Sequence, residues 1–165
     1  MSVSVQLQPA DTAPRAVDYR WDADTDILTA KLRGPADKVG ISGSVELEGP
    51  DGSWLILDVS GGSIDGVEVA VWPDVHKRHA LAPPAAEDAR VMVPSSSTTG
   101  AVASLEVETR LLAESDDAER VIHFRVGAQR DVRTVRVGRD LLLDVDPQSR
   151  IAGVWLLNVP PFPDT

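Results

Sequence analysis

The sequence predicts a mainly β protein with little helix, built from two related β-rich lobes that pack together as a pseudo-dimer. Three observations predict it. Apolar and polar residues alternate with a period of two over much of the 165-residue chain, as they do in half-buried strands. Clusters of Gly, Pro, Asp and Ser separate these stretches, as in turns. Finally, a segment near the end of the chain resembles one in the middle, which indicates an internal duplication.

The internal resemblance joins the middle of the chain to its end. Both segments contain an apolar run ending in Asp, a polar turn, and a Gly that begins a second apolar run. The exposed strand edges of one copy would invite pairing with another chain, so duplication lets each lobe cover the other. We expect a monomeric pseudo-dimer or a homodimer. The predicted boundaries are 1–80 for the first lobe, 81–101 for a Pro/Ala/Ser-rich connector, and 102–165 for a second, divergent lobe.

The first lobe is predicted to consist of short strands joined by tight turns. Strands are expected over residues 3–7, 17–21, 27–32, 45–48, 54–59 and 64–72. The acidic stretch 22–26 is predicted to turn a hairpin, and residues 49–52, Gly-Pro-Asp-Gly, give a strong turn signal.

The middle of the chain has a different composition, because it contains Pro73, Pro83, Pro84 and Pro94. These prolines exclude a long helix, so only short helical turns are expected near residues 75–81 and 85–90. Residues 95–100, Ser-Ser-Ser-Thr-Thr-Gly, are expected to be a mobile connector. A phosphate-binding loop is less favoured, since no lysine-bearing helix follows.

The second lobe repeats the pattern of short strands. They are expected over residues 102–112, 120–126, 132–137, 141–145 and 151–159, with an acidic turn over residues 114–119.

Two motifs of the first lobe resemble a known family. Residues 21–32 read aromatic, Asp, acidic turn, Asp, then an apolar strand ending in a basic residue and Leu. Residues 58–69 read Asp, turn, Gly, apolar, Glu, apolar. This pattern is similar to the YuzE-like domains, small bacterial domains of unknown function. The resemblance covers residues 17–72 and, more weakly, 103–159. It implies a compact β-rich fold and brings no established activity, cofactor or catalytic residue.

The repeated Asp and Gly positions have a structural explanation. We expect Asp58 and Asp144, each at the end of a strand, to accept hydrogen bonds from backbone amides of the following turn. Gly66 and Gly153 would allow either a positive φ or a close backbone approach. The second copy departs from the first in one respect, because Trp155 stands where the first has Glu.

Composition excludes several classes of function. The formal net charge of −10 disfavours nucleic acid and anionic membranes and favours a basic protein partner. The chain has no cysteine, which excludes disulfides, thiolate zinc sites and cysteine nucleophiles. The first residues lack the features of a signal peptide, and no segment approaches the roughly 18 apolar residues that a spanning helix needs. A cytoplasmic bacterial protein is therefore expected.

No metal or cofactor site is predicted. The acidic stretch 22–26 resembles the start of a calcium loop, but Ile27 and Arg33 occupy the positions where such a loop needs Gly and Glu. His76 and His79 are spaced for a metal on a helical turn, but Lys and Arg lie between them and no third ligand is evident. An exposed basic loop is favoured.

Catalytic residues are not evident either. No serine lies in a nucleophile elbow, and no carboxylate pair can be singled out. His123 alternates with apolar neighbours and is expected to face solvent. The exception is a run of arginines in an otherwise acidic chain, from which we select Arg125, Arg133 and Arg136 as candidate ligand-binding residues, with Arg125 beside Arg136 on neighbouring strands. Arginine forks bind carboxylate or phosphate well. The competing interpretation is that these arginines pair with acidic residues of the first half.

Two functions follow from these observations. The leading hypothesis is a non-enzymatic protein-interaction module that neutralises a basic partner such as a toxin. The alternative is a small anionic-ligand binder, or an enzyme, that uses a cleft between the lobes. A purely structural role in a larger assembly is a third, weaker hypothesis.

Overall fold

The computed structural model describes residues 3–34, 42–94 and 102–163. Within these residues the chain forms strands, turns and loops and no helix, which confirms the prediction of a mainly β protein. The described residues therefore contain no helix that is long and apolar enough to cross a membrane. The predicted mobile connector over residues 95–100 lies outside the described residues.

Five strands form a first antiparallel unit, which we call the first unit (residues 17–71). Its strands are β2 (Val17–Asp22), β3 (Ile27–Leu32), β4 (Ser42–Glu48), β5 (Trp54–Ser60) and β6 (Ser63–Val71). They lie side by side in the order β2–β3–β6–β5–β4. The hairpin predicted around the acidic turn at residues 22–26 is confirmed, since β2 pairs with β3 along its whole length.

Five later strands form the second unit (residues 111–156). They are β10 (Leu111–Ser115), β11 (Ile122–Val126), β12 (Arg133–Gly138), β13 (Leu141–Val145) and β14 (Ile151–Leu156). Their order in space is β10–β11–β14–β13–β12, and every neighbouring pair is antiparallel. The second unit therefore has the strand order of the first.

The remaining strands connect and extend the two units. β8 (Glu87–Met92) runs parallel to β12 and meets β6 through one residue pair, and β1 (Gln6–Pro9) pairs with β8. β9 (Val102–Glu108) adds to β4, and β7 (Val75–Lys77) adds to β10. The helical turns expected near residues 75–81 and 85–90 are wrong. Pairing with neighbouring strands decides the conformation there, as it often does for short segments of weak local preference.

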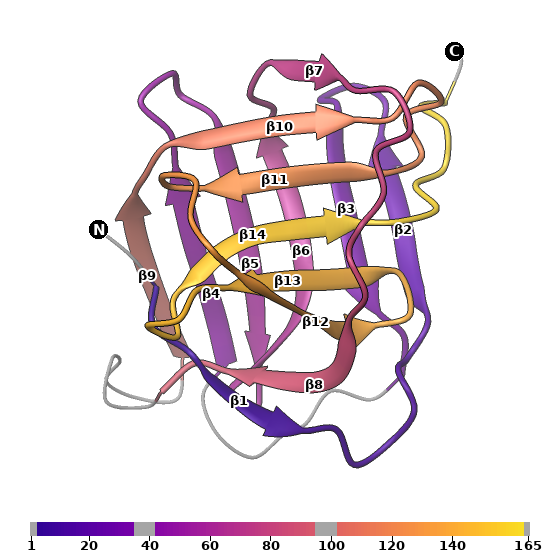
Figure 1. The fold of residues 1–165 in the computed structure, drawn as a ribbon. Helices are drawn as coiled ribbons and strands as arrows, with labels where there is room; N and C mark the ends of the chain where they lie inside the picture. Colours follow the sequence, from indigo (N-terminus) through magenta and orange to yellow (C-terminus); the bar gives the residue numbers. More distant parts are fainter. Residues whose placement is uncertain (1–2, 35–41, 95–101, 164–165) are drawn as a thin grey trace.

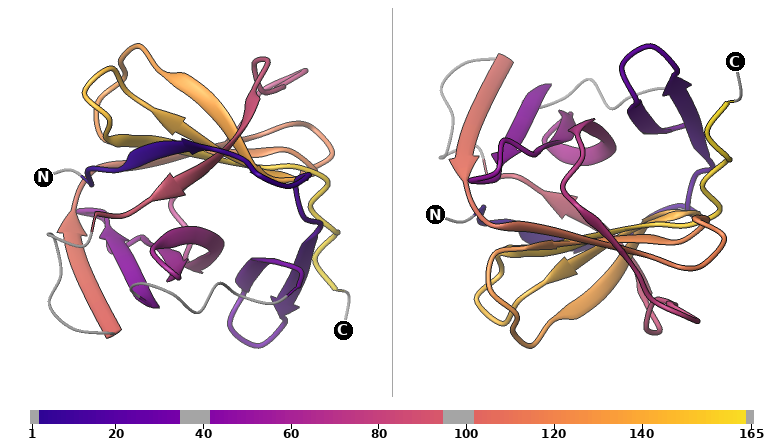
Figure 2. Two further views of the ribbon diagram at one scale, coloured as in Figure 1. Left: turned by 90° about the horizontal axis from the view of Figure 1, so that it is seen from below. Right: turned by 90° about the horizontal axis from the view of Figure 1, so that it is seen from above.

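The two units form two layers whose strands cross at a steep angle (Figure 1). Both views in Figure 2 show the layers edge-on, one above the other. Apolar side chains from the facing sides fill the space between them as one core. Its largest members are Leu28, Leu47, Leu55 and Leu57 from the first unit and Phe124, Leu141, Leu143 and Leu156 from the second. Orthogonal packing of two sheets around a shared core accounts for this arrangement.

Polar and aromatic contacts also join the layers at the C-terminal end of the chain. The hydroxyl of Tyr19 donates to the carbonyl of Leu157 at 2.7 Å, and the indole of Trp21 donates to the carbonyl of Pro160 at 2.9 Å. Since both donors lie on β2, they fix the segment after β14 against the edge of the first unit.

The two units agree in register as well as in strand order. In each, an Asp near the end of the fourth strand of the unit, β5 or β13, faces a Gly on the neighbouring strand, and a bulge follows the Asp. Starting from this Asp–Gly pair and following the strand pairing to the neighbouring strands of each unit gives six pairs of equivalent positions. They are Thr29 and His123, Lys31 and Arg125, Ser44 and Thr134, Asp58 and Asp144, Gly66 and Gly153, and Glu68 and Trp155.

Candidate functional site

A pocket lies on the outer face of the second unit, on the side away from the core. Its floor is formed by β11, β13 and β14, and two segments, residues 78–82 and 128–132, cover its sides. Both segments pass in front of β14 in Figure 1. The cavity measures about 390 Å³, within the range of small-molecule sites.

The most buried polar group on the pocket floor is the carboxylate of Asp144. The side chain of Thr134 donates to its Oδ1 at 2.6 Å and the indole of Trp155 donates to the same oxygen at 3.2 Å. Nε2 of His123 lies 2.8 Å from Oδ2. Because an ionised carboxylate only accepts hydrogen bonds, Nε2 is the donor in this contact. The expectation that Asp144 would bind amides of the next turn is wrong, since its partners are three side chains.

His123 is held between this carboxylate and an aromatic ring. Its ring stacks on Trp155 with 4.0 Å between the ring centroids, and only 18% of its side chain is exposed. The prediction that His123 faces solvent was therefore wrong. The alternation of the sequence had placed it correctly on the face opposite the core, but that face is covered here.

Gly153 makes room for the contact between His123 and Asp144. A Cβ atom at this position would clash with the Asp144 carboxylate and would lie 3.0 Å from Nε2 of His123. Of the two roles expected for this glycine, close approach is the one that applies, because its φ is not positive.

Arg125 lies on the same face of β11 as His123 and lines the pocket. Within the residues that the structure describes, it makes no hydrogen bond and no ion pair, and its Nε is the one buried side-chain nitrogen or oxygen without a partner. Buried polar groups are almost always hydrogen-bonded, so an orphaned one on a pocket wall needs an explanation.

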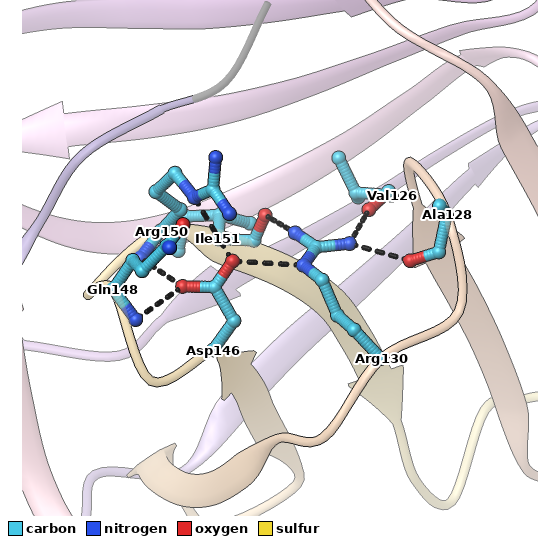
Figure 3. A network of polar contacts seen from close by, with 7 residues as sticks. All are labelled: Val126, Ala128, Arg130, Asp146, Gln148, Arg150 and Ile151. Atoms are coloured by element: carbon cyan, nitrogen blue, oxygen red, sulfur yellow. Dashed lines mark hydrogen bonds and ion pairs between the residues drawn. The ribbon is translucent and has the colours of Figure 1, made fainter.

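Arg130 also lines the pocket, but its donors are occupied (Figure 3). Nε donates to Asp146 at 2.8 Å, and the two terminal nitrogens donate to the carbonyls of Val126, Ala128 and Ile151 at 2.7 to 3.0 Å. The guanidinium therefore fixes the segment before β12 over the sheet. Its role is structural.

Asp146 completes this network (Figure 3). Its second oxygen accepts from the backbone amides of Gln148 and Arg150, both at 2.9 Å, and Nε of Arg150 adds an ion pair at 3.0 Å. Burial by itself would raise the pKa of Asp146, but these hydrogen bonds and that from Arg130 lower it below the ordinary value. The hydrogen bonding to turn amides that was expected of Asp144 is made two residues later.

The rim of the pocket carries a second ion pair. Arg78 lies 3.2 Å from Glu114 of β10, and about two thirds of the arginine side chain is exposed. Nearby, His79 is exposed and lies 2.7 Å from Asp117, and His76 is exposed as well. Among the described residues, no group of three His, Cys, Asp or Glu side chains could hold a metal ion.

The structure does not bring the three predicted arginines together. β13 and β14 lie between β11 and β12, so the prediction that Arg125 lies beside Arg136 is wrong. Arg136 lines a different cavity, of about 320 Å³, where the two layers meet at residues 10–15 and 88–90. Arg133 is exposed and pairs with Glu87 of β8 at 2.6 Å. The competing interpretation, pairing with an acidic residue, thus describes Arg133, whereas Arg125 has no such partner in the described part of the chain.

The equivalent face of the first unit has a different character. Burial raises the pKa of Asp58, and the nearby charge of Lys31 only partly opposes this. Burial, together with repulsion from Asp58, also raises the pKa of Asp65 and of Glu68. Three carboxyl groups thus lie near one another, and the charges of Lys31 and Arg15 oppose the raised pKa values only in part.

Comparison with known proteins does not identify a family. No family model matches the chain, and no curated protein matches it in sequence. The resemblance to YuzE-like domains therefore stays a prediction, and function must be argued from the pocket itself.

Proposed function

We propose that the protein binds a small anionic molecule in the pocket over β11, β13 and β14. One observation carries the proposal, namely that the partially buried guanidinium of Arg125 has no acidic partner among the residues that the structure describes. A desolvated cation is destabilising unless it is paired, and an anion in the pocket would supply the missing charge and hydrogen bonds. Arginine presents its donors as a planar fork that suits carboxylate and phosphate groups.

The location differs from the cleft between the lobes that the sequence suggested. The space between the two layers is filled by the core, apart from the cavity beside Arg136 at their margin. That cavity is a weaker candidate, since the guanidinium of Arg136 already donates to the carbonyl of Arg139 at 2.5 Å. The proposed site therefore depends on the outer face of the second unit alone.

A ligand screen with two arginine variants tests this proposal. Carboxylates, dicarboxylates, inorganic phosphate and nucleotides are titrated while the thermal unfolding midpoint is followed, because a ligand that binds only the folded state raises it. At least one anion should raise the midpoint of the wild type and of Arg133→Gln, and none should act on Arg125→Gln. Arg133 is the matched control because it is an exposed arginine outside the pocket. Equal responses of the two variants, or no response to any anion, would reject the proposal.

As a second candidate, we propose a basic protein partner that docks on the first unit. This is supported by the net charge of −10 and by the raised pKa values of Asp58, Asp65 and Glu68, which a docked cationic side chain would lower. Capture from native lysate at several salt concentrations should be weakened in the double variant Asp58→Asn and Glu68→Gln. It should be unaffected when the exposed pair Asp117 and Glu119 is neutralised in the same way.

We further propose that the two units arose by duplication of one YuzE-like domain and now form a pseudo-dimer within one chain. The shared strand order and the six equivalent positions support this proposal. Analytical ultracentrifugation should then find a monomer. An experimental structure in which residues 17–72 and 103–159 fail to superpose would count against a common origin.

A further inference from the structure

We infer that the ligand is a hydroxycarboxylic acid, whose carboxylate binds Arg125 and whose hydroxyl donates a hydrogen bond to Nδ1 of His123. This inference rests on the proposed function, because it concerns the same pocket. It adds a second recognition contact, made by a neutral histidine, and with it the class of ligand.

Two side chains that line the pocket have polar atoms without a partner in the part of the chain that the structure describes. One is Arg125, whose Nε is buried without a hydrogen bond. The other is His123, because the one hydrogen bond of its ring joins Nε2 to Asp144 and leaves Nδ1 with none.

Nδ1 of His123 is an acceptor that a ligand can reach. In a neutral imidazole one nitrogen donates and the other accepts, so donation from Nε2 to Asp144 makes Nδ1 the acceptor. Among the described residues, Nε of Arg125 is the one side-chain nitrogen or oxygen that is buried and unpartnered. Nδ1, which is also unpartnered, is therefore not buried. The pocket thus offers one cationic donor and one uncharged acceptor.

The two groups are fixed at a spacing that a small molecule can span. His123 and Arg125 point to the same face of β11, where alternate residues lie roughly 6–7 Å apart along the strand. Stacking on Trp155, with 4.0 Å between the ring centroids, and the hydrogen bond to Asp144 hold the imidazole in one orientation. A carboxylate and a hydroxyl on one short frame can therefore contact both side chains together.

The charges lining the pocket fit an acid with a single negative charge. They sum to +1 with the histidine neutral, and the groups counted are Arg78, Arg125, Arg130, Glu114 and Asp144. Behind Arg130, the charges of Asp146 and Arg150 cancel each other. One carboxylate neutralises this excess. The group that donates to the histidine should then be uncharged, as a hydroxyl is, because an ammonium group would restore the excess.

The rest of the pocket accommodates the frame that joins the two groups. Its walls include the apolar side chains of Leu81, Val132 and Ala152, and its volume is about 390 Å³. An aromatic ring or a short alkyl chain suits a cavity of this size and lining.

Isothermal titration calorimetry of the full chain tests the inference at pH 8, where an ordinary imidazole is neutral. The probes are 3- and 4-hydroxybenzoate, compared with benzoate and with the two matching methoxybenzoates, which keep the oxygen but cannot donate. At least one hydroxybenzoate should bind about 3- to 10-fold more tightly than benzoate and than its methoxy counterpart, because only the hydroxyl can pair with Nδ1.

Two variants assign the preference for the hydroxyl to a residue. His123→Phe keeps a ring against Trp155 but has no acceptor, so it should bind hydroxybenzoate and benzoate equally. Glu114→Met removes the carboxylate at the rim of the pocket and should keep the preference. Circular dichroism checks that each variant is folded. If His123→Phe is not, His123→Lys replaces it, because lysine can donate to Asp144 but cannot accept.

The outcomes separate this inference from the proposal beneath it. Equal binding of hydroxybenzoates and benzoate by the wild type would overturn the inference, as would a preference that survives in His123→Phe or disappears in Glu114→Met. Anion binding in the pocket would still stand if Arg125→Gln abolished it. Absence of binding by every anion, or binding that Arg125→Gln leaves unchanged, would overturn both.

Discussion

In the first unit, Asp58 lies near Lys31, and burial raises the pKa of Asp58. At the equivalent position of the second unit, Asp144 accepts three hydrogen bonds and forms the floor of a pocket. The surrounding strands have the same order and register in both. The backbone alone therefore does not create the site.

Two neighbouring positions account for much of the difference. Thr29 faces Glu68 across β3 and β6, and His123 faces Trp155 across β11 and β14. The second pair supplies two donors to the carboxylate, where the first supplies another acid that repels it. The segments over the outer face of the second unit then remove this polar cluster from solvent. A site can thus arise on an existing sheet through one cross-strand pair and a cover.

The largest predicted loss of unfolding free energy concerns the turn of the last hairpin, which the two units stabilise in different ways. The turn between β5 and β6 relies on Gly61 and Gly62, which have positive φ, whereas the turn between β13 and β14 relies on Asp146 and its partner Arg130. Arg130→Met removes one of the two arginines that pair with the buried Asp146 and also removes the donor of three backbone carbonyls, so it should lower the free energy of unfolding by about 3 kcal/mol.

Urea denaturation measures this loss. The matched change in the first unit is Ser63→Ala, which removes one local hydrogen bond of 3.1 Å and should lower the unfolding free energy by only about 1 kcal/mol or less. Similar losses in the two variants would mean that the network of Arg130 is not what holds the second turn.

How far the sequence predicts this difference can be seen at particular residues. The repeated Asp and Gly are visible in it, and they mark the equivalent strands. Alternation also places His123 and Arg125 on one face. The contact between His123 and Trp155 could not be predicted, since it requires knowing that β14 inserts between β11 and β13. Such pairing is decided by long-range contacts that leave no local pattern.

The same reason explains the errors. Arg125 and Arg136 were expected to be neighbours because their strands follow one another in the chain, but two later strands separate them. A helical turn was expected near residues 85–90, where the structure has β8. The partners of β8, which are β1 and β12, are distant in sequence, so their pairing leaves no local signal. One signal in the sequence was available, because Trp155 stands where the first unit has Glu68, and this marked the two segments as chemically different.

A smaller effect is expected from the two glycines that face the aspartates. Gly153→Ala should lower the unfolding free energy by about 1–3 kcal/mol, because the added methyl clashes with Asp144 and with the carbonyl of Phe124, 2.9 Å away. Gly66→Ala should cost less, since its closest contacts are 3.0 Å and 3.2 Å, to the carbonyl of Ala30 and to Asp58. Urea denaturation compares the two variants. A larger loss for Gly66→Ala would show that the second carboxylate is the more easily displaced.

The smallest predicted change in unfolding free energy comes from replacing the Asp of each unit by Asn. Its sign should differ between the two units. Asp144→Asn replaces an acceptor by an amide group among three donors, so it should destabilise the protein by about 1–2 kcal/mol. Asp58→Asn should stabilise it at neutral pH, because the pKa of Asp58 is raised in the fold and its ionised form is therefore less stable there than in the unfolded chain.

The pH dependence of the unfolding free energy provides a control for this comparison. A carboxyl group whose pKa is raised by folding binds its proton more readily in the folded state, so the wild type gains stability relative to the unfolded chain as the pH falls through that raised value. The advantage of Asp58→Asn should then shrink as the solution is acidified from neutral pH, while the defect of Asp144→Asn should not reverse. Unfolding free energies of wild type and both variants across that range measure the trend. If Asp58→Asn destabilised the protein at neutral pH, the carboxylate of the first unit would have a stabilising partner after all, and the contrast between the two units would be one of degree.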